Sequence, residues 1–224
     1  YHRLTPSDTL LGVKKTRQIT GMPFVALRSH AMPPSKARFK RLLDLVYVLV
    51  ALPLLLPLMV FTVVYARIVA GKSVFYRQER VGRYGREFSM VKIRTMYIGA
   101  EDVTGPVLAT REDERVIPAM AWMRSMRFDE LPQVWNVIRG EMALVGPRPE
   151  RQELADRFEM VIPGYGRRHD IRPGITGLAQ VNGSYHTDLG FKLGHDLQYL
   201  VNWTPVLDIQ ILLRTIFVVL ARRV

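Results

Sequence analysis

The stretch LVYVLVALPLLLPLMVFTVVYA, residues 45–66, decides how this chain folds. It carries no charged side chain over 22 positions, and a helix needs about 20 consecutive apolar residues to cross a bilayer. Pro53 and Pro57 lie in its middle. Each proline removes a backbone donor and crowds the preceding turn, so the pair predicts a kink or a break. We therefore expect a membrane-seated helix.

Basic residues flank this apolar segment on both sides. Because a positive flank favours the cytoplasmic side of a membrane, the charges choose no orientation for a simple crossing. Three interpretations remain: a straight span with a tolerated kink, a re-entrant helix that turns at the prolines and leaves by the same face, and a buried helix of a soluble protein. Asp44, at the mouth of the segment, is expected to cap the helix or to pair with Lys40 or Arg41. The flanking cations are Lys36, Arg38, Lys40 and Arg41 before the segment, and Arg67 and Lys72 after it.

The remaining sequence suggests a tail, a globular unit and a short terminal helix. The N-terminal part is rich in Thr, Ser, Pro and basic residues, which is typical of a linker or the tail of a preceding module, and its apolar run 24–27 is a candidate strand. The C-terminal part predicts an amphipathic helix that begins at Thr204 and is too short to cross a bilayer, so it either docks into the core or lies in the membrane interface, where Arg222 and Arg223 suit lipid headgroups. The four predicted parts are residues 1–38, 39–72 (the membrane helix), 73–203 (the globular unit) and 204–224.

Residues 73–97 predict a β-hairpin with its turn between Gly82 and Gly85. No Gly-Lys-Ser/Thr string follows the glycines and no helix opens there, so the turn does not match a phosphate loop. Lys92 and Arg94 alternate with apolar residues, which puts both cations on one face of the second strand. That face is either solvated or a wall that binds phosphate.

Two helices are expected after the hairpin. Residues 115–127 have apolar residues at helical spacing, and Pro132 is well placed to begin a second helix that ends near Gly140. Asp129 and Glu130 then lie at a helix N-terminus, where the macrodipole favours carboxylates. Capping is the structural interpretation of this acid pair.

Composition narrows the classes of function. Lys and Arg outnumber Asp and Glu by 32 to 20, for a formal charge of +12. This balance suits nucleic acid, an anionic membrane surface or phosphorylated small molecules. Nucleic-acid binding finds no support, because no aromatic-rich RNA-binding string or zinc module is present. The absence of cysteine excludes disulfides, thiolate nucleophiles and Cys-ligated zinc, and the five histidines lack metal-ligand spacing.

A series of uncommon strings follows the acid pair, and it decides the functional interpretation. The strings are DELPQ at 129–133, WNV at 135–137, LVGPRPE at 144–150 and RPGITGLAQVNG at 172–183, followed by Asp196, Tyr199, Asn202 and Trp203. From about residue 39 to the C-terminus, the chain closely resembles the bacterial sugar transferase family, the monotopic polyprenyl-phosphate phosphoglycosyl transferases. Pro57 stands where that family has the proline that breaks its re-entrant helix, so the resemblance favours re-entry.

The resemblance implies a fold, a reaction and a location. The fold is mixed α/β (α+β): a monotopic membrane protein with a Pro-broken re-entrant helix, a small cytosolic catalytic domain at 73–203 and amphipathic interfacial helices. Family members transfer a sugar 1-phosphate from a UDP-sugar to undecaprenyl phosphate, releasing UMP through a covalent phosphosugar-aspartate intermediate. They use Mg²⁺ and act at the cytoplasmic face of the bacterial inner membrane, among membrane lipids, in polysaccharide synthesis. The sugar, the pathway and the oligomeric state stay open, a homodimer included.

The resemblance assigns the nucleophile to Asp129 and its partner role to Glu130. A carboxylate can attack phosphorus if it is ionised. Arg124 and Arg127, three residues apart, are expected to share a helix face and, with the helix N-terminus, to lower the pKa of Asp129. Both acids are candidate Mg²⁺ ligands, because this ion prefers carboxylate and phosphate oxygens.

Binding a diphosphate requires cations that stay charged, and arginine supplies such a cation with a planar, bidentate donor edge. Arg148, held between two prolines, is the first candidate, and a stiff surface loop with a solvated Arg is the alternative. Turns with positive φ are expected at Gly174, Gly177 and Gly183. Trp203 is expected to be a core residue or an interface anchor. The remaining phosphate-binding candidates are Arg124, Lys92, Arg94 and Arg172.

The chain departs from the common family pattern in three places, which bears on donor specificity. Arg-Ser-Met-Arg-Phe at 124–128 replaces the usual Thr-Ser-Leu before the acid pair, Leu56 replaces a Ser before the kink proline, and Ser184 replaces an Arg. Two other functions stay in view. A basic membrane-bound scaffold would not need Asp129, and a nucleotide-sugar phosphohydrolase would not need the apolar segment.

Overall fold

The computed structural model describes residues 32–100, 113–162, 164–183 and 189–221, together with the backbone of three short strands near the N-terminus. Those strands, β1 (His2–Arg3), β2 (Thr16–Ile19) and β3 (Met22–Val25), form an antiparallel sheet in the order β1-β3-β2. The predicted strand at 24–27 is therefore found two residues earlier. Ser184, Arg222 and Arg223 lie outside the described residues.

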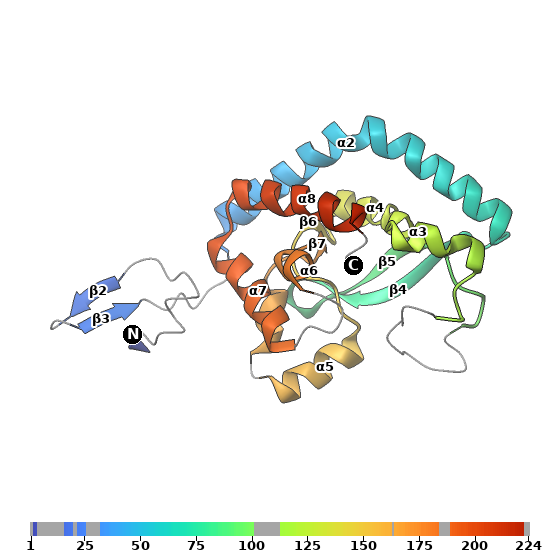
Figure 1. Ribbon diagram of the computed structural model, residues 1–224. Coiled ribbons are helices and arrows are strands. Elements are labelled where there is room, and N and C mark those ends of the chain that lie inside the picture. Colours follow the sequence, from blue (N-terminus) through green and yellow to red (C-terminus); the bar gives the residue numbers. More distant parts are fainter. Residues whose placement is uncertain are drawn as a thin grey trace.

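The apolar segment belongs to one long helix, α2 (Pro34–Val69), of 36 residues. The helix continues through Pro53 and Pro57 and bends into an arch over the rest of the molecule (Figure 1). The predicted kink is present as this bend, whereas a break into two helices is not observed. Each proline removes only one donor, and the neighbouring turns keep the helix intact.

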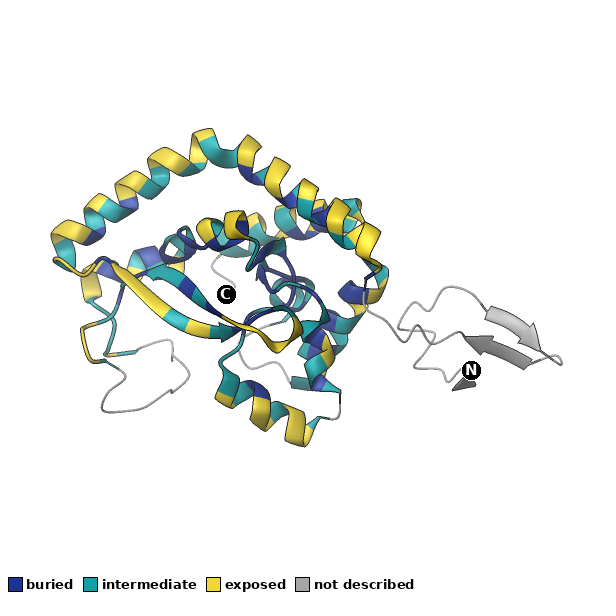
Figure 2. Ribbon diagram, turned by 180° about the vertical axis from the view of Figure 1, so that it is seen from behind, coloured by how far each residue is buried: buried dark blue, intermediate teal, exposed yellow. Residues whose placement is uncertain are grey.

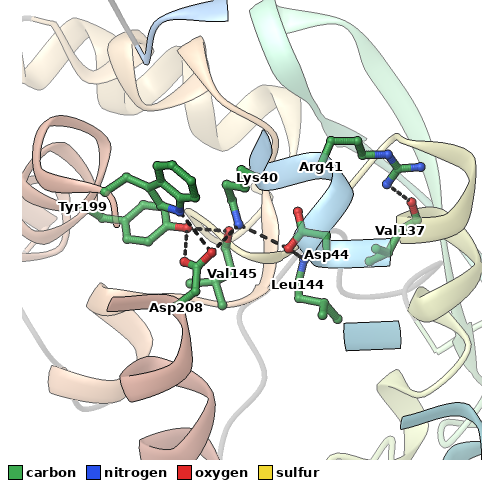
Figure 3. A network of polar contacts seen from close by, with 9 residues as sticks. Lys40, Arg41, Asp44, Val137, Leu144, Val145, Tyr199 and Asp208 are labelled. Atoms are coloured by element: carbon green, nitrogen blue, oxygen red, sulfur yellow. Dashed lines mark hydrogen bonds and ion pairs between the residues drawn. The ribbon is translucent and has the colours of Figure 1, made fainter. Parts of the chain in front are cut away.

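Both ends of α2 pack against the same globular domain. Near the N-terminal end, Lys40 lies within 3.2 Å of Asp44 and 3.0 Å of Asp208 on the C-terminal helix (Figure 3). Near the other end, the hydroxyl of Tyr65 donates to the carbonyl of Ala119 at 2.8 Å. The predicted pairing of Asp44 with Lys40 is confirmed, and the arch joins two separate contacts with one body.

The predicted hairpin is confirmed as β4 (Phe75–Val81) and β5 (Glu87–Ile93), joined by the 3-10 turn η1 (Arg83–Gly85). The strands pair antiparallel, with Tyr76 opposite Lys92 and Arg80 opposite Phe88. Because directly opposed residues share a sheet face, one face of the hairpin carries the even-numbered side chains of both strands. This face is turned toward the candidate site.

The predicted helix at 115–127 is shorter than expected. The structure has η2 (Pro118–Met120) and α3 (Ala121–Ser125), because the preceding residues pair with the end of the hairpin: the amide of Ile117 donates to the carbonyl of Thr95 at 2.9 Å. Arg127 has a left-handed φ of 59° and lies outside the helix, so it does not share a helical face with Arg124. The next helix, α4 (Gln133–Arg139), follows Pro132 and ends at Gly140, as predicted.

The C-terminal half of the chain surrounds the hairpin. Figure 1 shows α8 and α4 between the arch of α2 and the hairpin, with α5 on the far side. Thr204 caps α8 by accepting from the amide of Leu207, and Trp203 is buried, so the predicted helix start and core role are confirmed. The remaining elements are β6 (Ala143–Val145), α5 (Gln152–Val161), η4 (Tyr165–Asp170), β7 (Gly174–Thr176), α6 (Leu178–Asn182), α7 (Leu189–Asn202) and α8 (Pro205–Leu220).

The glycines beside β6 and β7 serve close backbone contact. These strands pair in parallel, and a Cβ on Gly174 would collide with the backbone of Gly146. A Cβ on Gly177 would collide with the carbonyl of Gly146 as well. The prediction that Gly174, Gly177 and Gly183 need positive φ is wrong, because none of the three has it. The close backbone contact beside β6 and β7 requires residues without a side chain, not residues with a left-handed backbone.

Replacing Gly174 by alanine is expected to destabilise the protein, since the new methyl meets backbone that has no room to move. Overpacking of this kind costs about 1–3 kcal/mol or more. Gly194→Ala is the matched control: Gly194 lies inside α7 with nothing near the added Cβ, so alanine should stabilise the helix by about 0.5–1 kcal/mol. Thermal melting of both variants in detergent measures the difference. A Gly174→Ala variant that melts with the wild type would contradict the packing argument.

Large apolar side chains are exposed along α2 and α8, and Figure 2 shows exposed positions along the outer turns of the arch. Leu49, Val50 and Leu54 on α2 are each at least 68% exposed. Among the described residues, α2 is the one helix that is long and apolar enough to cross a membrane. Apolar surface of this extent marks a face that contacts lipid or another protein.

Candidate active site

The acid pair lies on the short 3-10 turn η3 (Phe128–Glu130), directly before α4. Asp129 and Glu130 are both buried, at 8% and 7% exposure. The left-handed backbone of Arg127 turns the chain sharply into η3, and β5 lies alongside it. The turn thus holds two adjacent carboxylates inside the protein, where each needs a cation or a ligand.

Glu130 is surrounded by cations. Its Oε1 lies 2.8 Å from the Nζ of Lys92, 3.5 Å from Arg127 Nη1 and 3.6 Å from Arg148 Nη2. Burial alone would raise the pKa of this carboxyl, but Lys92, Arg148 and Arg127 outweigh it and hold the pKa well below its usual range. Glu130 is therefore ionised, and it gathers cations from three separate parts of the chain.

Asp129 has the opposite environment. Its Oδ1 is buried and has no hydrogen-bond partner among the described residues. Burial and the neighbouring charge of Glu130 raise the pKa of Asp129 to about 6, although Lys92, Arg127 and Arg124 oppose the shift. The prediction of a lowered pKa is thus wrong, because desolvation exceeds the effect of the arginines. At neutral pH the group is still mostly ionised.

The donor set fits a magnesium ion in part. The bare Oδ1 of Asp129 is an available oxygen ligand, whereas the Glu130 carboxylate is already engaged by three cations. The described residues contain no cluster of three acidic or imidazole side chains. Mg²⁺ commonly binds through one or two carboxylates and completes its coordination with substrate phosphates and water. The site fits that mode rather than a complete protein cage.

Arg148 is positioned by a buried network beneath its loop. Arg168, 4% exposed, donates from Nη2 to the carbonyl of Arg148 at 3.0 Å and lies 2.8 Å from Asp196. Arg168 also lies 3.8 Å from Glu150. This network holds the loop that presents Arg148 to the acid pair.

Asn136 plays the same part for Lys92. Its side-chain amide donates to the carbonyl of Ser89 at 2.9 Å, and its oxygen accepts from the amide of Val91 at 3.2 Å. Asn136 is 1% exposed and joins α4 to β5. The two hydrogen bonds fix the strand next to the residue that reaches Glu130.

The phosphate-binding candidates divide into two groups. Lys92 and Arg148 contact Glu130, and Arg124 lies near enough to lower the pKa of Asp129. Arg94 instead donates to the carbonyls of Ser73, at 2.6 Å, and Ala70, where it caps the end of α2.

Arg172 also belongs to the second group. It donates to the carbonyl of Gly140 at 2.7 Å and lines a different pocket, beside Lys40 and Arg83. Arg94 and Arg172 therefore satisfy backbone carbonyls at helix ends, and the structure does not bring either of them to the acid pair.

Two residues that the sequence analysis missed line the pocket at Glu130. Arg80 and Gln133 join Lys92, Glu130 and Arg148 around it. The alternation of the hairpin could have revealed Arg80, since a register with Arg80 opposite Phe88 puts it on the face of Lys92. Gln133 follows the acid pair on the first turn of α4 and is buried.

An aromatic cluster adjoins the acid pair on the side of α2. Trp122 packs edge-to-face with Phe128 at 5.9 Å between ring centroids and with Tyr65 at 5.3 Å. Phe61, 55% exposed on α2, lies 6.5 Å from Trp122. The cluster runs from the exposed surface of α2 to the residue beside Asp129, so the acid pair lies close to the apolar helix.

Comparisons with known proteins agree with this arrangement. Residues 35–222 match the family model described as bacterial sugar transferase. A UDP-N-acetylgalactosamine-undecaprenyl-phosphate N-acetylgalactosaminephosphotransferase of Aeromonas hydrophila is 38% identical over 98% of this chain and 52% of its own length. A UDP-glucose:undecaprenyl-phosphate glucose-1-phosphate transferase of Klebsiella pneumoniae is 34% identical over 91% of this chain and 44% of its own. The exopolysaccharide production protein ExoY of Rhizobium meliloti is 33% identical over 90% of this chain and 94% of its own.

The relatives differ in length but share one region. The chain spans about half the length of the first two relatives, whereas it covers nearly all of the third. The matched region includes the long apolar helix, the acid pair, the loop of Arg148 and the C-terminal helix. Taken with the buried acid pair and its cations, the match shows that this chain belongs to the bacterial sugar transferase family.

Proposed function

We propose that the protein transfers a sugar 1-phosphate from a UDP-sugar to undecaprenyl phosphate, forming undecaprenyl-diphosphate-sugar and UMP. The observation that carries the proposal is the difference in environment between the two acids of the pair. Glu130 is held by Lys92, Arg127 and Arg148, while Asp129 keeps one buried oxygen without a partner. A bare carboxylate oxygen surrounded by fixed cations suits attack on a phosphate group.

The first step forms a covalent adduct. Oδ1 of Asp129 attacks the phosphorus that carries the sugar, and the bond from that phosphorus to the bridging oxygen of the diphosphate breaks. UMP leaves with the bridging oxygen and its electron pair, and Asp129 becomes an acyl phosphate. Lys92 and Arg148, both within reach of Glu130, stabilise the charge on the phosphate oxygens.

The second step restores the enzyme. A phosphate oxygen of undecaprenyl phosphate attacks the same phosphorus, the bond from phosphorus to Asp129 breaks, and the carboxylate is released. Both steps exchange one phosphorus–oxygen bond for another. The carboxylates of the acid pair, Asp129 and Glu130, would hold Mg²⁺, which would neutralise phosphate charge when bound.

The arrangement of α2 supports a re-entrant seat at the cytoplasmic face of the bacterial inner membrane. A straight helix of 36 residues would be about 54 Å long and would place its ends on opposite sides of a bilayer. Here Lys40 and Tyr65, near opposite ends, contact the same domain. The exposed apolar middle of the arch would lie in the lipid, and the basic flanks would both face the cytoplasm.

Release of UMP tests the proposal. Detergent-solubilised protein with magnesium is given a panel of UDP-sugars, with and without undecaprenyl phosphate. We expect one donor to release UMP through many turnovers only when the lipid is present, and at most one equivalent per protein without it. Many turnovers without the lipid would indicate a phosphohydrolase. No release from any donor, with intact lipid binding, would indicate a scaffold.

A further inference from the structure

Arg80 is a half-buried cation that does not contact the acid pair. It lies on β4, lines the pocket with Lys92 and Arg148, and is paired with no carboxylate in the part of the chain that the structure describes. Its Nη1 donates to the carbonyl of Pro149 at 3.3 Å and its Nη2 donates to the side-chain oxygen of Gln78. Two neutral acceptors hold the guanidinium in place without neutralising it.

The remaining nitrogen of Arg80 has no partner. Its Nε–H is buried and donates to none of the described residues, so one donor is left unsatisfied next to the pocket. Burial and the nearby charge of Arg148 lower the pKa of Arg80 to about 10, which still leaves it charged at neutral pH. Glu150 opposes this shift but forms no ion pair with Arg80, and a partly desolvated charge that lacks such a pair is costly. This cost is offset if an anion binds there.

The position of Arg80 distinguishes the two phosphate substrates. β5 lies between β4 and α4 (Figure 1). The aromatic cluster of Phe61, Tyr65, Trp122 and Phe128 connects the acid pair to α2. A lipid phosphate whose chain stays in the bilayer reaches Asp129 from the side of α2. Arg80, on the strand beyond β5, faces the pocket from the opposite side.

We propose that Arg80 binds the phosphate that leaves with the nucleoside monophosphate, through the planar donor edge of its guanidinium. The inference rests on the proposed function and names a residue for the donor half of the reaction. Arg148 and Lys92 serve the phosphate that is transferred, because they converge on Glu130. Arg80 adds two nitrogen donors, of which Nε is still free, and a planar donor pair suits a phosphate.

The test compares Arg80→Gln with Arg77→Gln. Arg77 lies on the same strand but on the opposite face, and it is exposed. UMP binding is measured by calorimetry, and the KM values for the UDP-sugar and for undecaprenyl phosphate are measured separately. For Arg80→Gln we expect UMP affinity to fall at least about tenfold and the donor KM to rise, with the acceptor KM unchanged. Arg77→Gln should match the wild type.

The outcomes separate this inference from the proposed function. Unchanged UMP affinity in a folded Arg80→Gln protein, or a rise in the acceptor KM in place of the donor KM, would overturn the role of Arg80. If Arg80→Gln does not fold, Arg80→Lys decides, since it keeps the charge but not the planar donor edge: weakened UMP binding supports the role and full affinity overturns it. Absence of lipid-dependent turnover in the wild type would instead refute the transferase, and direct UMP binding would still report on Arg80.

Discussion

The Asp129→Asn variant is expected to release UMP at least about a thousandfold more slowly than the wild type, with or without undecaprenyl phosphate. The substitution keeps the shape of the side chain but replaces the carboxylate with a neutral amide, which does not attack phosphorus. Because Oδ1 of Asp129 has no hydrogen-bond partner among the described residues, no hydrogen bond to that oxygen is lost. Rapid-quench measurement of UMP, together with the mass of the intact protein, reports both the rate and the missing phosphosugar adduct.

The thermal stability of the Asp129→Asn variant should not fall with its activity. The pKa of Asp129 is raised to about 6, so its ionisation costs stability as the pH rises through that value. Asparagine carries no such cost. In magnesium-free buffer at pH 8, we expect the variant to melt at the same temperature as the wild type or higher, which would show that the lost activity is not lost folding.

Asp156→Asn is the matched control for this variant. Asp156 is an exposed acid on α5, where its carboxylate accepts from Gln152 at 2.7 Å. Full activity is expected of it. If Asp129→Asn kept more than about a tenth of the wild-type rate, Asp129 would not be the nucleophile, and attack by water activated at the pair would have to replace the covalent step.

Replacing Lys40 by methionine is expected to lower the free energy of unfolding by about 3–5 kcal/mol. Lys40 is 6% exposed and lies between the carboxylates of Asp44 and Asp208, at 3.2 and 3.0 Å. Tyr199 and Trp203 donate to the same Asp208, at 2.7 and 3.0 Å (Figure 3). Methionine fills the volume but leaves two buried carboxylates facing each other without a cation.

Thermal melting in detergent measures this loss, which corresponds to a fall of at least about 6 °C for a domain of this size. Lys36→Met is the control, because Lys36 lies one turn earlier on α2 and is exposed. We expect its melting temperature to stay within about 1–2 °C of the wild type. Equal melting of the two variants would mean that the buried network contributes little to holding α2 on the domain.

The sequence predicted those elements whose signals are local. The apolar length of residues 45–66, the glycine turn after β4 and the proline before α4 each specify an element through its own residues. The helix expected at 115–127 was too long because hydrogen bonds to the end of the hairpin, far away in sequence, hold its first residues in an extended form. Local periodicity contains no information about such a contact.

The sequence predicted the kind of chemistry at the site, but only some of the residues that form it. Asp129, Glu130 and Arg148 belong to the strings that carry the resemblance, and Lys92 follows from the alternation of the hairpin; Lys92 and Arg148 both contact Glu130 in the structure. Arg94 and Arg172 carry the same charge, yet each is used to satisfy carbonyls at a helix end. An arginine that binds phosphate and one that caps a helix look alike in a sequence, and only tertiary structure separates them.

The shift in Asp129 was missed for a related reason. The arginines near it are visible in the sequence, whereas the depth at which it is buried is not. Desolvation depends on every element packed above the side chain. The sign of a pKa shift at a buried site therefore follows from the three-dimensional structure more than from the charges of the neighbouring residues.

The docking of both ends of α2 on one domain has a mechanical consequence. A membrane anchor attached at a single point lets a soluble head swing, and the height of its reactive group above the bilayer then varies. A helix that contacts the domain near both of its ends prevents this swinging motion. In the proposed membrane seat, the carboxylate of Asp129 would stay at one depth, so that the phosphate of a carrier lipid, itself confined to the headgroup layer, meets it without being lifted from the membrane.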